Sequence, residues 1–188
     1  MQTKTNIKAL QMSNHYEWYT PRKYIDLVCL AFGERIDLDP ASSFLAQKQV
    51  DARRYCTIDD DGLKQDWSCT SLFLNPPYQR KTGLFVDKLT SEFLRGVVPQ
   101  GIVLVNSNTQ TKYYQKLCSI SASICITDHR IKFISGDGTI QDKPPHGNTF
   151  FYLTNDPTPL KSQKFDNVFS NIGTILYPAH RWRSLNGH

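Results

Sequence analysis

The stretch that decides the fold reads LFLNPPY and runs from Leu72 to Tyr78. Its three apolar residues predict a short buried strand. The two consecutive prolines end that strand, because each proline fixes φ and lacks an N–H donor. The loop that follows is therefore stiff, and its carbonyl groups have no partner in a ladder. Open α/β sheets bind ligands at such carboxyl ends of strands, so this segment predicts both a strand and a binding site.

Helical and extended patterns alternate on both sides of this segment. The helices are expected over 21–32, from Ser42 or Ser43 through Ala52, and over 81–93, 111–118 and 165–171; the strands over 36–39, 54–58, 71–74, 101–105, 123–127, 130–134, 148–154 and 174–177. The run GIVLV at 101–105 is apolar throughout, as in a strand covered on both faces. This alternation predicts an α/β fold with a single open, mostly parallel twisted sheet and helices on both faces.

The composition is that of one ordinary globular domain. The chain has 188 residues, of which 39% are hydrophobic and 21% charged, and this excludes disordered and fibrous classes. Lys and Arg number 22 against 17 Asp and Glu, a net charge of +5. Such a charge permits a polyanionic partner such as nucleic acid but does not require one.

Cysteine usage and hydropathy bear on the compartment. The five cysteines are scattered without a CxxC pair, so neither a disulfide framework nor a metal site is expected. The first residues lack an apolar signal core, and no apolar run reaches the length of a membrane span. These features predict a cytoplasmic protein with no membrane partner. Residues 1–14 are expected to be flexible.

Several motifs together carry a family resemblance. Asn75-Pro76-Pro77-Tyr78 resembles the NPPY or DPPY tetrad of amino-methyltransferases. In the same order, WYTP at 18–21, DLDPAS at 37–42, and DGL at 61–63 with DW at 66–67 resemble motifs of the phage-type DNA N-6-adenine methyltransferase (Dam-like) family. The resemblance runs from about Trp18 to Tyr152. It implies a single Rossmann-like class I methyltransferase domain over 1–188 in a bacterial or phage-infected cell, with S-adenosyl-L-methionine as methyl donor.

The tetrad is the expected catalytic centre. The exocyclic N6 amine of adenine is a poor nucleophile, because its lone pair is delocalised into the ring. Hydrogen-bond acceptors aimed at the amine protons would localise the lone pair, and the Asn75 side-chain oxygen and the Pro76 carbonyl are suited to this. Pro77 keeps the loop stiff, and Tyr78 offers a face on which an extruded base can stack.

The resemblance also implies a donor pocket. Its expected residues come from three segments, namely Tyr19, Thr20 and Pro21; Asp39, Pro40 and Ala41; and Asp66 with Trp67. Asp39 follows a strand and can accept hydrogen bonds from the donor's ammonium or ribose. Asp66 is suited to the donor's adenine amine, with Trp67 as an apolar wall. The segment from Asp39 to Ser43 contains none of the glycines common in methyltransferases, which leaves close backbone approach to the donor less assured.

Double-stranded DNA is the expected partner. Arg130 and Lys132 flank Ile131, and Lys143 and His146 lie in a Gly/Pro-rich loop over 135–147 that can follow a groove. These four basic residues are the candidate DNA contacts. The loop is a candidate recognition element.

Other interpretations of the same residues stay open. The tetrad can be a tight turn with a surface tyrosine, and Asp39-Pro40 can be a turn that ends a strand. An NPPY site would also serve cytosine N4, an RNA base or a protein glutamine, because each is an sp² nitrogen that needs the same acceptors. A non-catalytic DNA-binding protein of the same fold is the alternative from a different class.

Overall fold

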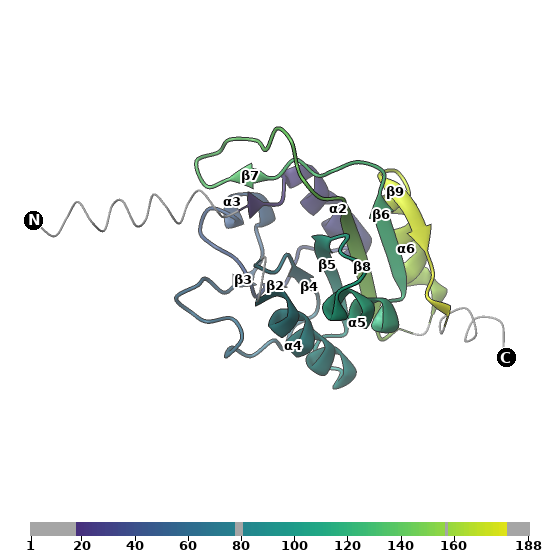
Figure 1. Cartoon of the computed structure of the whole chain (residues 1–188). Helices are drawn as coiled ribbons and strands as arrows, with labels where there is room; N and C mark the ends of the chain where they lie inside the picture. Colours follow the sequence, from purple (N-terminus) through teal and green to yellow (C-terminus); the bar gives the residue numbers. More distant parts are fainter. Residues whose placement is uncertain (1–17, 78–80, 157, 180–188) are drawn as a thin grey trace, which may run out of the picture.

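The computed structural model describes residues 18–77, 81–156 and 158–179. Its helices are α2 (Arg22–Phe32), α3 (Gln47–Val50), α4 (Thr82–Leu94), α5 (Lys112–Ile120) and α6 (Pro159–Phe169). Its strands are β1 (Trp18–Tyr19), β2 (Leu38–Asp39), β3 (Arg54–Tyr55), β4 (Leu72–Leu74), β5 (Gln100–Asn106), β6 (Ser123–Thr127), β7 (Ile134–Ser135), β8 (Asn148–Thr154) and β9 (Gly173–Leu176). Figure 1 shows their arrangement around a central sheet.

The central sheet has seven strands in the order β3-β2-β4-β5-β8-β6-β9. The pairs β3/β2, β2/β4 and β4/β5 are parallel, whereas β5/β8, β8/β6 and β6/β9 are antiparallel. The α/β class is therefore confirmed, but the sheet is mixed. The expected mostly parallel arrangement describes the half that contains β4, since β8 and β9 run against their neighbours.

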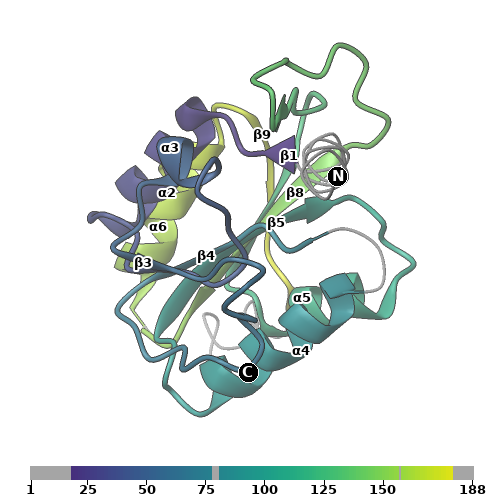
Figure 2. The same ribbon diagram turned by 90° about the vertical axis from the view of Figure 1, so that its left-hand side faces the viewer.

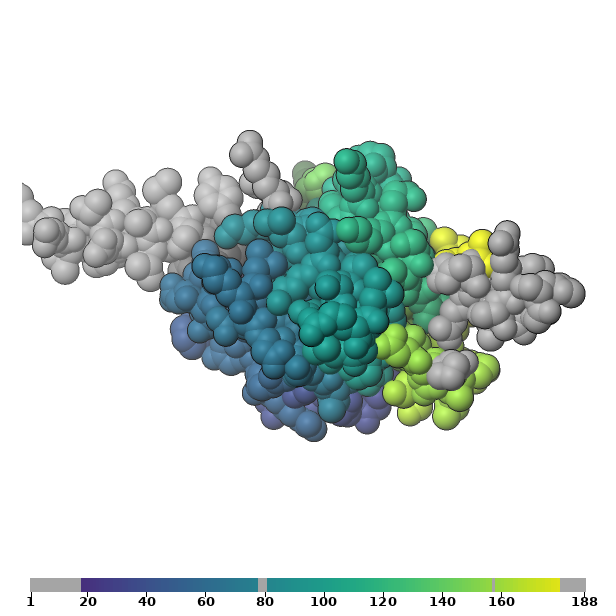
Figure 3. All heavy atoms as spheres, turned by 90° about the horizontal axis from the view of Figure 1, so that it is seen from below, coloured from purple at the N-terminus to yellow at the C-terminus, as the bar shows by residue number. Residues whose placement is uncertain are grey.

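Helices cover both faces of this sheet, as the alternation of strand side chains requires. Ile102 and Leu104 of β5 pack on the side of α2 and α6, whereas Val103 and Val105 pack on the side of α4 and α5. Figure 2 shows the two helical layers on opposite sides of the strands. In the space-filling view of Figure 3, the blue N-terminal part and the teal and green middle of the chain form one continuous body.

The ends of the elements follow from local chemistry. Helix α2 ends where Gly33 adopts φ 74°, and its N–H donates to the carbonyls of Cys29 and Leu30, which is the expected glycine stop. Helix α6 begins at Pro159, earlier than the expected 165, because proline fits the first helical position. The helices expected over 21–32, 81–93 and 111–118 and most expected strands lie where the sequence predicted them, within a few residues at their ends. The helix expected from Ser42 or Ser43 through Ala52 is much shorter than predicted, since only α3 is helical there.

One expected strand, 130–134, is wrong. Ile131 and Phe133 are buried and alternate with exposed Arg130 and Lys132, which imitates a strand. However, the Ile131 N–H donates to the side chain of Asn148 at 3.0 Å rather than to a neighbouring strand. A paired strand begins only at β7, which pairs antiparallel with β1 in a separate two-stranded sheet. The sequence did not predict β1, which is only two residues long.

Candidate active site

A cavity of about 380 Å³ opens at the carboxyl ends of the parallel strands β2, β3 and β4. Its size lies within the roughly 300–1,000 Å³ that is typical of small-molecule sites. Its walls come from the β1–α2 junction, the segments after β2 and β3, the end of β4 and the start of α4. They comprise Trp18, Tyr19, Thr20, Asp39, Pro40, Ala41, Ser42, Ser43, Ala46, Val50, Cys56, Thr57, Ile58, Asp61, Gly62, Leu63, Phe73, Asn75, Pro76, Pro77, Lys81 and Phe85.

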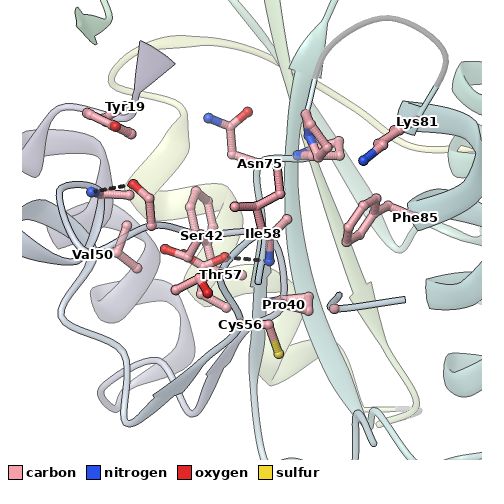
Figure 4. A pocket seen from close by; sticks show the side chains of 18 of the residues that line it. Tyr19, Pro40, Ser42, Val50, Cys56, Thr57, Ile58, Asn75, Lys81 and Phe85 are labelled. Atoms are coloured by element: carbon pink, nitrogen blue, oxygen red, sulfur yellow. Dashed lines mark hydrogen bonds between the residues drawn. The ribbon is translucent and has the colours of Figure 1, made fainter. Parts of the chain in front are cut away.

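Asn75 is the central polar side chain of this cavity. Its Nδ2 donates to the Thr20 hydroxyl at 3.2 Å, and this contact fixes the orientation of the amide. Its Oδ1 is buried and has no hydrogen-bond partner among the described residues. Figure 4 shows Asn75 between Tyr19 on one side and Lys81 on the other. A buried carbonyl oxygen without a partner costs about 1–3 kcal/mol, so this arrangement favours a ligand that supplies an N–H.

The two prolines that follow hold Asn75 in place. Pro76 is buried and Pro77 exposed, and both line the cavity. The Pro77 carbonyl accepts a hydrogen bond from the Thr82 hydroxyl at 2.8 Å, which ties the loop to the first turn of α4. Tyr78, the last residue of the tetrad, lies outside the described residues.

Asp39 is the buried acidic group of the cavity, with 3% of its surface exposed. Its Oδ1 accepts from the Ala41 N–H at 3.2 Å and its Oδ2 from the Gln47 amide at 3.1 Å. Burial raises the pKa of Asp39 to about 6, against the lowering effect of hydrogen bonds from Ser42, Ala41 and Gln47. Asp39 is thus held in one orientation, and an approaching cation would favour its ionised form.

The segment after β2 makes a close backbone contact without containing a glycine itself. Gly62, from the loop after β3, supplies the missing space: a Cβ on Gly62 would lie 2.0 Å from the Pro40 carbonyl oxygen. The buried Trp67 fixes this loop, since its indole Nε1 donates to the Gly62 carbonyl at 2.8 Å. The sequence did not identify Gly62 as a site residue, although the DGL motif contains it.

The residues expected to bind the donor divide into two groups. Tyr19, Thr20, Asp39, Pro40 and Ala41 all line the cavity, and Pro21 follows directly as the N-cap of α2. Asp66 and Trp67 do not line it. Asp66 is exposed and accepts hydrogen bonds from Ser68, which lower its pKa, whereas Trp67 is fully buried and stacks on Phe85.

The residues expected to contact DNA are all exposed and lie around β7 and the loop that follows it. The Arg130 guanidinium donates to the Pro144 carbonyl at 3.1 Å, which joins the two basic segments. His146 lines a second, smaller cavity. Lys132 and Lys143 have exposed side chains. No group of three His, Cys, Asp or Glu side chains in the described part of the chain could hold a metal ion.

The greater part of the sequence matches the model of a protein family. Residues 8–159 match DNA N-6-adenine-methyltransferase (Dam), and this range covers most of the chain and every wall of the cavity. The chain belongs to the Dam family. A comparison with curated proteins gives no match. Within the described residues, no helix of this Dam family member combines the length and apolarity needed to cross a bilayer.

Proposed function

We propose that this chain is an adenine-specific, site-specific DNA methyltransferase that transfers a methyl group from S-adenosyl-L-methionine to the N6 amine of an adenine extruded from duplex DNA. Membership of the Dam family supports DNA adenine methylation. The observation that carries the residue-level proposal is the buried Oδ1 of Asn75, which lacks a donor among the described residues and lies in the cavity. An amine N–H supplies that donor.

The cavity suits the methyl donor chemically. The donor carries an ammonium, a carboxylate and an adenosine group, and the cavity offers the Asp39 carboxylate, the Lys81 side chain and apolar walls such as Ile58 and Phe85. The carboxyl ends of parallel strands are the usual position for such a ligand. We therefore infer that Tyr19, Thr20, Asp39, Pro40 and Ala41 bind the donor. Trp67 is proposed to act on this site through its hydrogen bond to Gly62, and no role in the donor pocket is proposed for Asp66.

The chain's own contribution to the reaction is to prepare the amine. When bound, S-adenosyl-L-methionine supplies an electrophilic methyl group on a sulfonium. Asn75 Oδ1 accepts a hydrogen bond from one amine N–H and the Pro76 carbonyl accepts one from the other, which concentrates the lone pair on nitrogen. The nitrogen gives up one of these two protons once it carries the methyl group. Both acceptors are preorganised, Asn75 by Thr20 and the loop by Thr82, so little reorganisation opposes the transfer. Tyr78 is proposed to stack on the extruded base.

DNA is proposed to bind across the carboxyl ends of the parallel strands, where the cavity opens. Arg130, Lys132, Lys143 and His146 would meet it there, because they surround β7, which pairs with β1 beside the cavity. Exposed cations of this kind hold phosphates and set the register of the duplex, while sequence is read by other groups.

Two measurements test the proposal. Nucleoside profiling of DNA from a methylation-free host that expresses the protein should detect N6-methyladenine, whereas N4-methylcytosine alone would contradict the assignment of the base. Calorimetric titration with S-adenosyl-L-methionine should show binding to one site per chain. A protein that binds DNA but neither binds the donor nor methylates would be the non-catalytic alternative.

A further inference from the structure

A second cavity of about 170 Å³ lies beside the first, and Trp18 lines both. It forms where the segment 131–148 passes over the end of β5. Its walls are Trp18, Asn106, Phe133, Gln141, Pro144, Pro145, His146 and Asn148. Apart from His146, they are rings, prolines and carboxamides, with no formally charged group. This is the chemistry that a planar, uncharged heterocycle requires.

The carboxamides of this cavity are held in defined orientations. Asn148 is buried; its Oδ1 accepts from the Ile131 N–H at 3.0 Å, so its Nδ2 is the group that donates to Asn106 Oδ1 at 3.3 Å. This contact occupies the acceptor of Asn106. The Nδ2 of Asn106 makes no hydrogen bond to any described residue and remains a donor at the cavity wall.

Gln141 provides the second amide. Its backbone N–H donates to the Phe133 carbonyl at 2.8 Å, which fixes the main chain at the rim. Its half-buried side-chain amide has no partner in the part of the chain that the structure describes, and it lines the cavity. A glutamine amide can donate an N–H to an acceptor on the edge of a base, such as the N7 of adenine.

The position of the cavity relates it to the reacting centre. Leu74 of β4 is paired with Val103 of β5 in parallel register, so Asn75 and Asn106 both come at the carboxyl ends of adjacent strands. A ring bounded by Trp18 and Phe133 would therefore lie next to the cavity that contains Asn75.

We propose that this second cavity is a nucleobase subsite, in which the Asn106 and Gln141 amides bind the edge of the target adenine ring and select it. The proposal rests on the proposed function, because it assigns the residues that recognise the base on which that function acts. Asn106 Nδ2 donates to one ring nitrogen and the Gln141 amide donates to another. Adenine offers N1 and N7 for this on the two sides of the amine, whose own protons face Asn75 Oδ1 and the Pro76 carbonyl. A guanine carries an N–H at the ring position where adenine offers N1 as an acceptor, whereas thymine and cytosine lack the second ring.

The test uses a duplex that carries the sequence found by mapping N6-methyladenine in host DNA, with 2-aminopurine at the target position as a fluorescent probe. Wild-type protein should raise its fluorescence as the base leaves the stack. Gln141→Leu and Asn106→Asp should each raise KM for the unmodified duplex on the order of 10- to 100-fold, and weaken the fluorescence response in parallel. Donor affinity should stay at the wild-type value in both variants.

Gln163→Leu is the matched control, because it makes the same substitution at an exposed position of α6, outside both cavities. It should leave KM and fluorescence unchanged. The subsite is contradicted if wild-type protein makes N6-methyladenine while Gln141→Leu and Asn106→Asp keep its KM and fluorescence response. A wild-type protein that makes no N6-methyladenine would instead contradict the proposed function.

Discussion

The walls of the two cavities differ in what holds them. The first is built on the sheet itself: Asn75 and Asp39 directly follow buried strands, and Trp67 fixes its loop from the core. The second is closed by the segment 131–148, which is held by the two-residue pairing of β7 with β1 and by side-chain contacts such as Arg130 to Pro144. The proposed chemistry thus lies on residues next to the central sheet, and the proposed recognition on a segment that can change without loss of the core.

The largest expected effect comes from Asn75→Ala, which tests whether the first cavity carries the chemistry. The variant removes an acceptor needed only as charge develops on the amine, so kcat should fall roughly 10²- to 10³-fold, by analogy with lost oxyanion-hole donors. Methyl incorporation from labelled donor into duplex DNA measures this. Donor affinity and thermal stability should change little, because the residue follows β4 rather than packing inside it. A near wild-type rate would remove Asn75 from the catalytic centre.

The next effect concerns Asp39. Asp39→Ala should weaken donor binding by about 1.5–3 kcal/mol, the range for a hydrogen bond to a charged group. In wild-type protein, donor affinity should also fall as the pH drops below about 6, because the carboxyl then becomes protonated. Calorimetry at several pH values measures both. Persistence of the same pH dependence in Asp39→Ala would assign it to another group.

The raised pKa of Asp39 has a second consequence, for stability. Its pKa in the fold, about 6, lies above the ordinary value of 3.8, so folding favours the protonated form. The contribution of Asp39 to the free energy of unfolding is therefore fully present below about pH 3.8 and is lost as the pH rises through about 6. Asp39→Asn serves as the control that removes this dependence while it keeps the side-chain shape.

The two regions also differ in how far the sequence predicted them. The tetrad proposed as catalytic and the segment after β2 are contiguous motifs next to strong strand signals. Asn75, Pro76 and Pro77 of the tetrad line the cavity, as does the segment after β2. By contrast, β1 pairs with β7 far along the chain, and a two-residue strand leaves no periodic pattern. Gly62 was not identified because its close approach to Pro40 is a contact between separate loops. Such contacts depend on tertiary packing, which local patterns do not encode.

A smaller effect is expected for substitution of Thr20, and whether it falls on kcat or on donor affinity matters more than its size. Thr20→Val removes the hydroxyl that accepts from Asn75 Nδ2, so the amide of Asn75 can turn and lose its alignment. One neutral hydrogen bond contributes about 1 kcal/mol, so kcat should fall several-fold. Thr20→Ser, which keeps the hydroxyl, should restore it. A change in donor affinity with unchanged kcat would instead indicate that Thr20 acts only on the donor.

The smallest effect should come from Lys143, in the second region. Lys143 is exposed and makes no ion pair with a described residue, so its charge is available to a DNA phosphate. Lys143→Ala should weaken DNA binding on all sequences alike and reduce the slope of log K against log salt by about 1, because one fewer counterion is released. Titrations of duplex DNA at several salt concentrations measure this slope. Lys161 on α6 is a suitable control. Helix α6 follows the end of β8, which pairs with the start of β5, so it lies near the amino end of β5 and away from the carboxyl ends where the cavity opens. Lys161→Ala should leave the slope unchanged, and an equal loss in both variants would show that the segment around β7 has no special part in binding DNA.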